Sequence, residues 1–127
     1  EKLSDDDTIN DVDNLYDFNQ AMAKIAQLNA SLYAGYNDWR LPNRFELGTL
    51  VDYGTTNPAV SSQLNQCSAG CTQLQCSCTA AGYYWTSTPW TSLPFAVLAV
   101  NFQDGTGSLG LISGGANLHV RAVRGGL

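Results

Sequence analysis

The stretch GYNDWRLPNRFEL, residues 35–47, decides how the first half of this chain folds. Its glycine, asparagines and proline interrupt regular structure, yet it also carries a tryptophan, two acidic residues and two arginines. Asn43 is a good helix N-cap, and Glu46, three residues later, completes a capping box. The stretch therefore predicts a corner followed by a short helix, which Gly54 and the Asn57–Pro58 pair end.

The charged and aromatic residues of this corner are first candidates for structural work. A partly buried Arg40 needs a carboxylate, and Asp38, Glu46 or Asp52 is close enough in sequence to supply one. Trp39 offers a large apolar face that anchors a loop. We interpret one set of residues as the structural motif: Asp38, Trp39, Arg40, Pro42, Glu46 and, later in the chain, Trp85. Arg44 is the cation of the stretch to which no structural role falls.

A longer helix precedes the corner and ends before Gly35. Asp17 and Gln20 form a capping box at its start. The apolar residues expected on its buried side recur at intervals of three and four. They are Leu15, Phe18, Met22, Ile25, Ala26 and Leu28. On the short helix the expected buried residues are Phe45, Leu47, Leu50 and Val51.

The second half of the chain changes to β-rich residues with a period of two. Residues 83–86 and 95–102 are predicted strands, and residues 103–107 form a hairpin turn from which 109–111 return. A last strand is predicted over Leu118–Val123. Helices first and strands later indicate an α+β domain, with two N-terminal helices packed on a twisted antiparallel sheet.

Composition limits the possible functions. The length of 127 residues suits one domain; we expect an acidic leader over residues 1–13, extended or frayed, and one binding domain over 14–127. Residues 1–17 hold seven acidic residues against one lysine, a balance of −6, whereas residues 18–127 balance at +1. No basic run suggests nucleic-acid binding. No apolar run is long enough for a membrane span.

Four cysteines fall in one short polar loop, residues 67–78. They are Cys67, Cys71, Cys76 and Cys78. Two disulfides are the favoured interpretation, with a zinc site and free thiols as alternatives. A bond between neighbouring Cys76 and Cys78 would be strained, so we favour the two connectivities that join Cys67 and Cys71 to Cys76 and Cys78. Disulfides would indicate an oxidising, extracellular or periplasmic location.

Several blocks in order along the chain resemble one family. They are Asp38-Trp39-Arg40-Leu41-Pro42, Glu46-Leu47, Leu50-Val51-Asp52-Tyr53, Asn57-Pro58-Ala59, Tyr84-Trp85-Thr86-Ser87-Thr88, Val100-Asn101-Phe102, Asp104-Gly105 and Val120-Arg121-Ala122-Val123-Arg124. At this spacing the chain resembles the bacterial Lcl C-terminal-domain family over roughly residues 15–126. The cysteine cluster and the acidic leader depart from the family's general pattern.

The resemblance implies a C-type-lectin-like fold, of the variant shared with formylglycine-generating enzymes. The family's eponym is the C-terminal domain of the Legionella collagen-like adhesin, which binds sulfated glycosaminoglycans and supports attachment and biofilm formation. Its collagen-like stalk implies a homotrimer, because three chains make a collagen helix. Adhesion, biofilm and virulence roles, at the bacterial cell surface or as a secreted protein, are therefore expectations from resemblance.

Candidate ligand contacts are the cations outside the corner motif, with one loop tryptophan. Arg44 and Lys24 are expected on exposed helix faces, where they would bind sulfate. Arg121 and Arg124 lie three apart on a strand and face opposite sides, so at most one lines a given surface and the other pairs with an acid. Trp90 is placed to stack on a sugar face.

The functional prediction is an extracellular adhesin domain that binds a sulfated polysaccharide of heparin, heparan sulfate or chondroitin sulfate type, multiplied by trimerisation. The alternative is a trimerising cap or protein-binding module without glycan specificity. We expect no enzyme, no cofactor and no metal site. His119, the single histidine, is interpreted as structural, and the oxygen-ligand loops of calcium-dependent lectins are missing.

Overall fold

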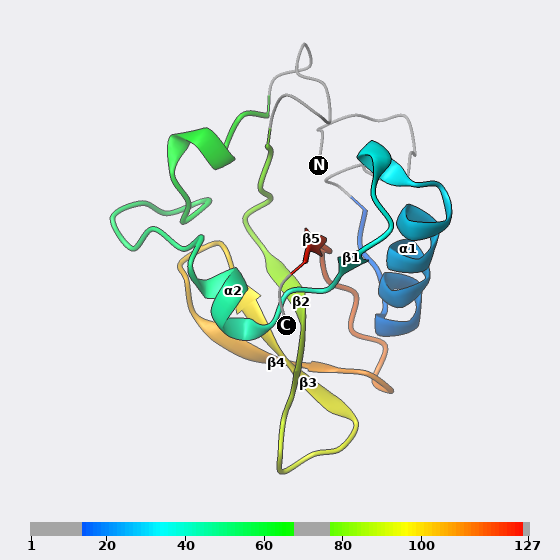
Figure 1. Ribbon diagram of the computed structural model, residues 1–127. Coiled ribbons are helices and arrows are strands. Elements are labelled where there is room, and N and C mark those ends of the chain that lie inside the picture. The colour runs from blue at the N-terminus through cyan, green and yellow to red at the C-terminus, as the bar shows by residue number, and fades with distance from the viewer. Residues whose placement is uncertain (1–13, 68–76, 126–127) are drawn as a thin grey trace.

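Helices and small antiparallel sheets make up the part of the chain that the computed structural model describes, residues 14–67 and 77–125 (Figure 1). The predicted α+β class is therefore confirmed. The predictions for the leader, residues 1–13, and for Cys71 and Cys76 concern positions outside the described residues.

Helix α1, Phe18–Ala30, begins where the capping box predicts. The side chain of Asp17 accepts from the backbone N–H of Gln20 at 2.8 Å, and the Gln20 side chain accepts from the N–H of Asp17 at 2.9 Å. The box satisfies two of the backbone donors that a helix start leaves unpaired.

The buried side of α1 differs from the predicted one. Its buried residues are Ala21, Lys24, Ile25 and Leu28. Leu15 and Met22, which were expected inside, are 52% and 48% exposed, and Ala26 is exposed too. The true stripe also repeats at threes and fours, but it includes a lysine, so hydrophobicity alone pointed to a neighbouring face.

A short 3-10 turn, η1 (Tyr33–Gly35), and strand β1 (Trp39–Arg40) lead into helix α2 (Arg44–Gly48). On α2, Leu47 is 1% exposed, whereas Phe45 is 75% exposed. The expectation that Phe45 is buried is wrong because successive helix residues turn by about 100°. Two positions apart, Phe45 and Leu47 cannot share one face. A second 3-10 turn, η2 (Ser62–Leu64), follows.

The main sheet has the antiparallel order β2-β3-β4, formed by Tyr83–Pro89, Ala96–Asn101 and Gly107–Leu111. This confirms the predicted strands and the hairpin turn. Gly105 in that turn has a φ of +83°, a left-handed conformation that favours glycine. Strand β5 (Val123–Arg124) pairs separately with β1.

The predicted continuous strand over Leu118–Val123 is not observed. Instead the chain makes two isolated bridges before β5: Leu118 pairs antiparallel with Tyr16, and His119 pairs parallel with Tyr84. Each residue has a different partner segment, so no ladder extends beyond one pair.

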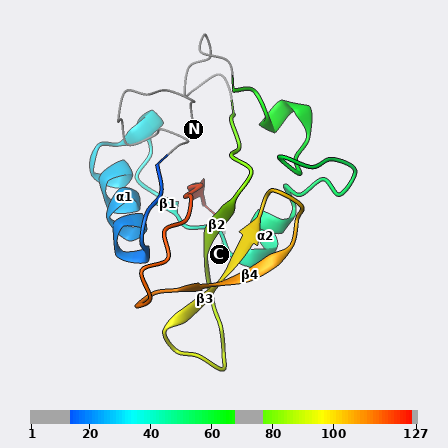
Figure 2. The same ribbon diagram turned by 180° about the vertical axis from the view of Figure 1, so that it is seen from behind.

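The main sheet packs on both faces. On one face Trp85 and Val97 join a buried cluster with Ile25 and Leu28 of α1. On the other face, Tyr84 belongs to a buried cluster that includes Leu47 of α2. Figures 1 and 2 show α1 and α2 at opposite sides of the sheet. Alternation along each strand sends neighbouring residues to opposite clusters.

Candidate functional site

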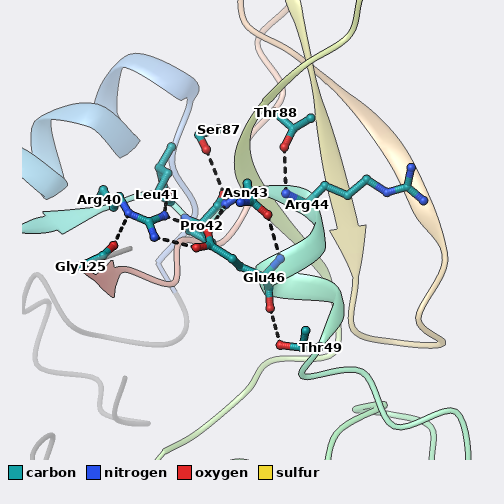
Figure 3. Close-up of polar contacts among 10 residues, drawn as sticks. All are labelled: Arg40, Leu41, Pro42, Asn43, Arg44, Glu46, Thr49, Ser87, Thr88 and Gly125. Carbon is teal, nitrogen blue, oxygen red and sulfur yellow. Dashed lines mark hydrogen bonds and ion pairs between the residues drawn. The ribbon is translucent and has the colours of Figure 1, made fainter. Parts of the chain in front are cut away.

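Arg40 is held at the corner by a carboxylate and by backbone carbonyls (Figure 3). Its Nη1 and Nη2 donate to the two carboxylate oxygens of Glu46, at 2.8 and 2.6 Å. Its Nε donates to the carbonyl of Gly125 at 2.7 Å, and Nη1 also reaches the carbonyl of Leu41 at 3.3 Å. The guanidinium thus ties the corner to the end of the chain.

Glu46 serves the corner and the helix together. One of its carboxylate oxygens also accepts from the N–H of Asn43 at 2.7 Å, while the Asn43 side chain accepts from the N–H of Glu46 at 2.8 Å. The hydrogen bond from Arg40, with that from the Asn43 backbone, lowers the pKa of Glu46 from 4.5 to about 2. Both partners are therefore charged and engaged, as the structural interpretation of the motif requires.

Three other residues of the structural motif are buried or half-buried, as a structural role predicts. Trp85 is fully buried and Pro42 is buried. Trp39 is half-buried, and its indole N–H donates to the carbonyl of Tyr33 at 3.1 Å. The carbonyl of Pro42 accepts from the N–H of Ser87 at 2.8 Å, which fixes the corner against β2.

Arg44 lies one residue beyond the N-cap and is exposed, as expected. Its backbone N–H donates to the hydroxyl of Thr88 on β2 at 2.8 Å, so its position relative to the sheet is fixed. Its guanidinium lies 5.7 Å from the ring centroid of Phe45. It makes no hydrogen bond or ion pair with any residue that the structure describes. Figure 3 shows the side chain extending away from the Arg40–Glu46 pair.

The β2–β3 hairpin tip starts two residues after Thr88 and carries two exposed aromatic side chains. Trp90 and Phe95 are 39% and 46% exposed. The backbone N–H of Trp90 donates to the carbonyl of Ala96 at 2.9 Å and so closes the loop. No charged residue occurs from position 77 to 103. Thr88 therefore links the backbone of Arg44 to the strand that leads into this uncharged loop.

Arg124 is the member of the C-terminal arginine pair that meets an acid. Its Nε donates to Asp38 at 3.1 Å, and its guanidinium carbon lies 3.2 Å from the ring centroid of Tyr36. Burial lowers the pKa of Arg124, but the interactions with Asp38 and Tyr36 outweigh this and raise it. Its side chain is still 38% exposed.

Arg121 forms hydrogen bonds at the C-terminal end of the cysteine loop. It is half-buried and donates to the hydroxyls of Thr79 at 2.6 Å and Ser77 at 3.1 Å, and to the carbonyl of Cys78 at 3.2 Å. These partners leave it little capacity for an external ligand. Arg124 is therefore paired with an acid, whereas Arg121 forms hydrogen bonds at the end of the cysteine loop.

Lys24 is not on an exposed helix face. It is 4% exposed, and its ammonium lies 4.8 Å from the ring centroid of Tyr16. A lysine can bury its long stem against apolar neighbours and still find a partner for its charge. The expectation of a solvent-exposed Lys24 is therefore wrong.

A disulfide joins Cys67 and Cys78 and closes the loop of residues 67–78. This bond belongs to one of the two favoured connectivities, and it excludes the zinc and free-thiol alternatives for these two residues. No cluster of His, Cys, Asp and Glu among the described residues is able to hold a metal ion. His119 stacks on Tyr84 with ring centroids 5.0 Å apart.

Sequence reasoning missed the two aromatic rings that support exposed cations, Phe45 under Arg44 and Tyr36 under Arg124. The apolar character of Phe45 predicts a core position, whereas its place directly after Arg44, the first residue of the helix, is a signal for a contact with that cation. The contact of Arg44 with Thr88 spans 44 residues, and no local pattern predicts it.

The chain belongs to the Lcl C-terminal domain family, whose family model matches residues 4–124. The family points to an adhesin-related domain. No curated protein and no solved structure matches the chain. None of the helices in the described ranges has the length and apolar character that crossing a membrane requires.

Proposed function

We propose that this chain is an extracellular adhesin domain that binds sulfated glycosaminoglycans, with Arg44 as its main sulfate contact. The observation that carries the proposal is the exposed guanidinium of Arg44, whose backbone is fixed by Thr88 and which has no carboxylate partner among the described residues. Arg40 and Arg124 each face a carboxylate. A planar guanidinium matches the geometry of sulfate oxygens and forms paired, charge-assisted hydrogen bonds with them.

The surroundings of Arg44 support a sugar ligand. Thr88 fixes its backbone and Phe45 lies beside its side chain, so part of its conformational freedom is already lost before binding. Trp90, in the neighbouring hairpin tip, offers an aromatic face on which a sugar ring stacks. Arg124 is a secondary contact through its exposed side. Lys24 and Arg121 are removed from the site by their burial and hydrogen bonds.

Trimerisation is part of this proposal. One exposed cation gives weak attraction to a polyanion, whereas three copies on one axis present three Arg44 side chains to the same chain of sulfates. The α+β architecture with antiparallel strands is compatible with the C-type-lectin-like fold, in its formylglycine-generating-enzyme-like variant, which we include in the proposal.

An extracellular, non-enzymatic role completes the proposal. The disulfide between Cys67 and Cys78 is favoured in an oxidising compartment. These two cysteines are not available as nucleophiles while they are bonded to each other. His119 packs against Tyr84, and its backbone N–H donates to the carbonyl of Tyr83 at 2.9 Å, which supports a structural role.

Retention on a heparin column tests the proposal. Wild type should bind at low salt, and Arg44→Ala should elute at a clearly lower salt concentration. Arg124→Ala is the comparison variant: it removes the same charge from a secondary contact that is already paired with Asp38, so its elution shift should be smaller than that of Arg44→Ala. Polyanion binding loses a salt exponent of about 0.7 per cation, by analogy with single-stranded nucleic acid, so Arg44→Ala in a trimer should reduce the slope by about 2.

Two results would sink parts of this proposal. If the wild-type protein flows through the heparin column at low salt, the proposed glycan binding is wrong, because electrostatic binding strengthens as salt falls. If the protein sediments as a monomer at micromolar concentration, the proposed trimer and the multivalent binding that depends on it are wrong. Equal elution shifts for Arg44→Ala and Arg124→Ala would leave Arg44 without its special role.

The alternative proposal is a protein-binding or trimerising module without glycan specificity. The exposed aromatic side chains of Trp90 and Phe95 on an uncharged loop favour it, because aromatic residues are enriched at protein interfaces. Loss of partner binding in Trp90→Ala, with heparin retention unchanged, would support this module over the glycan site.

A further inference from the structure

Strand β4, Gly107–Leu111, is the outer strand of the main sheet, and in the described ranges it pairs only with β3 (Figure 1). Outer strands leave a row of backbone N–H and C=O groups without partners. Native proteins usually protect such an edge with a charge, a proline or a bulge. The β4 sequence GSLGL has none of these, and no charged residue occurs from position 105 to 118.

The register shows which backbone groups face outward. Asn101 donates to the carbonyl of Thr106 at 2.8 Å, and Ile112 donates to that of Phe95 at 2.8 Å. Hydrogen-bonded and non-hydrogen-bonded pairs alternate along an antiparallel ladder. Ser108 and Gly110 therefore bond to β3, and Gly107, Leu109 and Leu111 direct their N–H and C=O groups away from the sheet.

The side chains of the same three positions share one face. Gly110 lies against the ring of Trp85, so its face belongs to the α1 cluster. Alternation places Gly107, Leu109 and Leu111 on the opposite face. There Leu109 and Leu111 are 41% and 38% exposed, and Gly107 has no side chain. The edge thus combines outward backbone groups with exposed leucines.

We propose that β4 is the contact surface for a second copy of this chain, paired antiparallel about a two-fold axis at Leu109. In this register Leu109 faces Leu109 of the other copy, and Leu111 faces Gly107. All three outward-facing residues of each copy then take part, as an isologous contact requires. The carbonyl of Leu111 now accepts from Gly114 at 3.5 Å, a long hydrogen bond that pairing would replace.

The shape of the β4 edge favours a second copy over an unrelated strand, and its lack of charge permits one. The large side chain of Leu111 covers the position where Gly107 of the other copy leaves space, and the two-fold axis repeats this fit. The acidic excess of the chain lies in residues 1–17, whereas residues 18–127 balance at +1, so charge repulsion between these parts of two copies is weak. The uncharged β4 edge is a place where two copies can approach without bringing like charges into contact.

The size of the contact makes the dimer weak. Five residues span about 17 Å of strand. Such a contact buries much less than the roughly 800 Å² per partner of a standard interface. We therefore expect a dimer that forms at high protein concentration. It is independent of the proposed glycan site and can link trimers as readily as monomers.

Cysteine cross-linking tests the register directly. A hydrogen-bonded antiparallel pair places its Cα atoms about 5.5 Å apart, within the range that a disulfide spans. Leu109→Cys should therefore give a covalent dimer on a non-reducing gel after mild oxidation. Ser108→Cys is the matched control, because diagonal neighbours in this pairing lie about 7–8 Å apart. Wild type controls for the native cysteines.

Equal cross-linking of Leu109→Cys and Ser108→Cys overturns the proposal. Sedimentation provides a second measurement without new thiols. The weight-average mass of wild type should rise between about 10 µM and 1 mM, since contacts below the standard size are weak, and Leu111→Lys should remove that rise. No rise in wild type, or an equal rise in Leu111→Lys, also overturns it. Glycan binding by Arg44 is unaffected by any of these outcomes.

Discussion

Adding one methyl group at Gly110 should destabilise the whole domain. Gly110 lies on β4 directly against the ring of Trp85. An alanine Cβ at this position would lie 2.2 Å from one ring carbon of Trp85 and within 3 Å of two more. Gly110→Ala therefore cannot fit unless the indole or the strand moves.

The indole of Trp85 has little room to move. Trp85 is fully buried, and its N–H donates to the carbonyl of Tyr16 at 2.7 Å. Its ring also meets that of Phe18 edge-on, with centroids 5.3 Å apart. Overpacking a well-packed core costs about 1–3 kcal/mol, and we expect Gly110→Ala to lower the free energy of unfolding by about 3 kcal/mol. For a chain of this size that is a fall in Tm of about 12 °C.

Urea unfolding and calorimetry of four variants measure this effect: Gly110→Ala, Gly107→Ala, Trp85→Phe, and Gly110→Ala combined with Trp85→Phe. Gly107→Ala is the matched control on the same strand, because its nearest contact is the carbonyl oxygen of Ala99 at 3.9 Å. It should change the unfolding free energy by no more than about 0.5 kcal/mol. Replacing Trp85 with Phe as well should reduce the cost of Gly110→Ala. Equal stabilities of Gly110→Ala and Gly107→Ala would refute the packing of Trp85 against β4.

Three further predictions concern the corner and the cysteine loop. The pKa of Glu46 is lowered from 4.5 to about 2, so its pairing with Arg40 stabilises the fold fully above pH 4.5 and is lost as pH falls through about 2. The difference in the free energy of unfolding between wild type and Glu46→Gln, measured by urea titration, should therefore narrow over that pH range. Asn43→Ala removes the N-cap and should cost about 1 kcal/mol, whereas Asn43→Ser should restore most of it; equal losses would contradict the cap. Replacing both Cys67 and Cys78 by serine opens a loop with a sequence separation of 11 and should cost up to about 3 kcal/mol in thermal unfolding; an unchanged Tm would count against this loop constraint.

Local features of the fold were readable from the sequence. Both capping boxes lie where the spacing of Asp17 with Gln20 and of Asn43 with Glu46 predicts them. The β3–β4 hairpin forms around the predicted Gly105 turn. In each case the interacting groups are within a few residues of each other. Their hydrogen bonds follow from backbone geometry, whatever the rest of the chain does.

The choice of partner for each arginine needed the tertiary structure. Sequence offered three acids for Arg40, and the fold selects Glu46 because α2 turns its first carboxylate back toward β1. Asp38 instead meets Arg124, 86 residues away, because β1 and β5 are neighbours. The pairing of strands that are distant in the sequence therefore determines which opposite charges meet.

The tertiary structure also determines which of the candidate site residues are buried. Hydrophobicity placed Phe45 inside and Lys24 outside, and the fold reverses both. Sequence by itself determined the class, the helix starts, the turn and the family signature, because these depend on local geometry and residue order. Only the packed structure decided that Arg44 stays without a carboxylate partner among the described residues, because the long-range pairing of the strands and the corner brings Glu46 to Arg40 and Asp38 to Arg124.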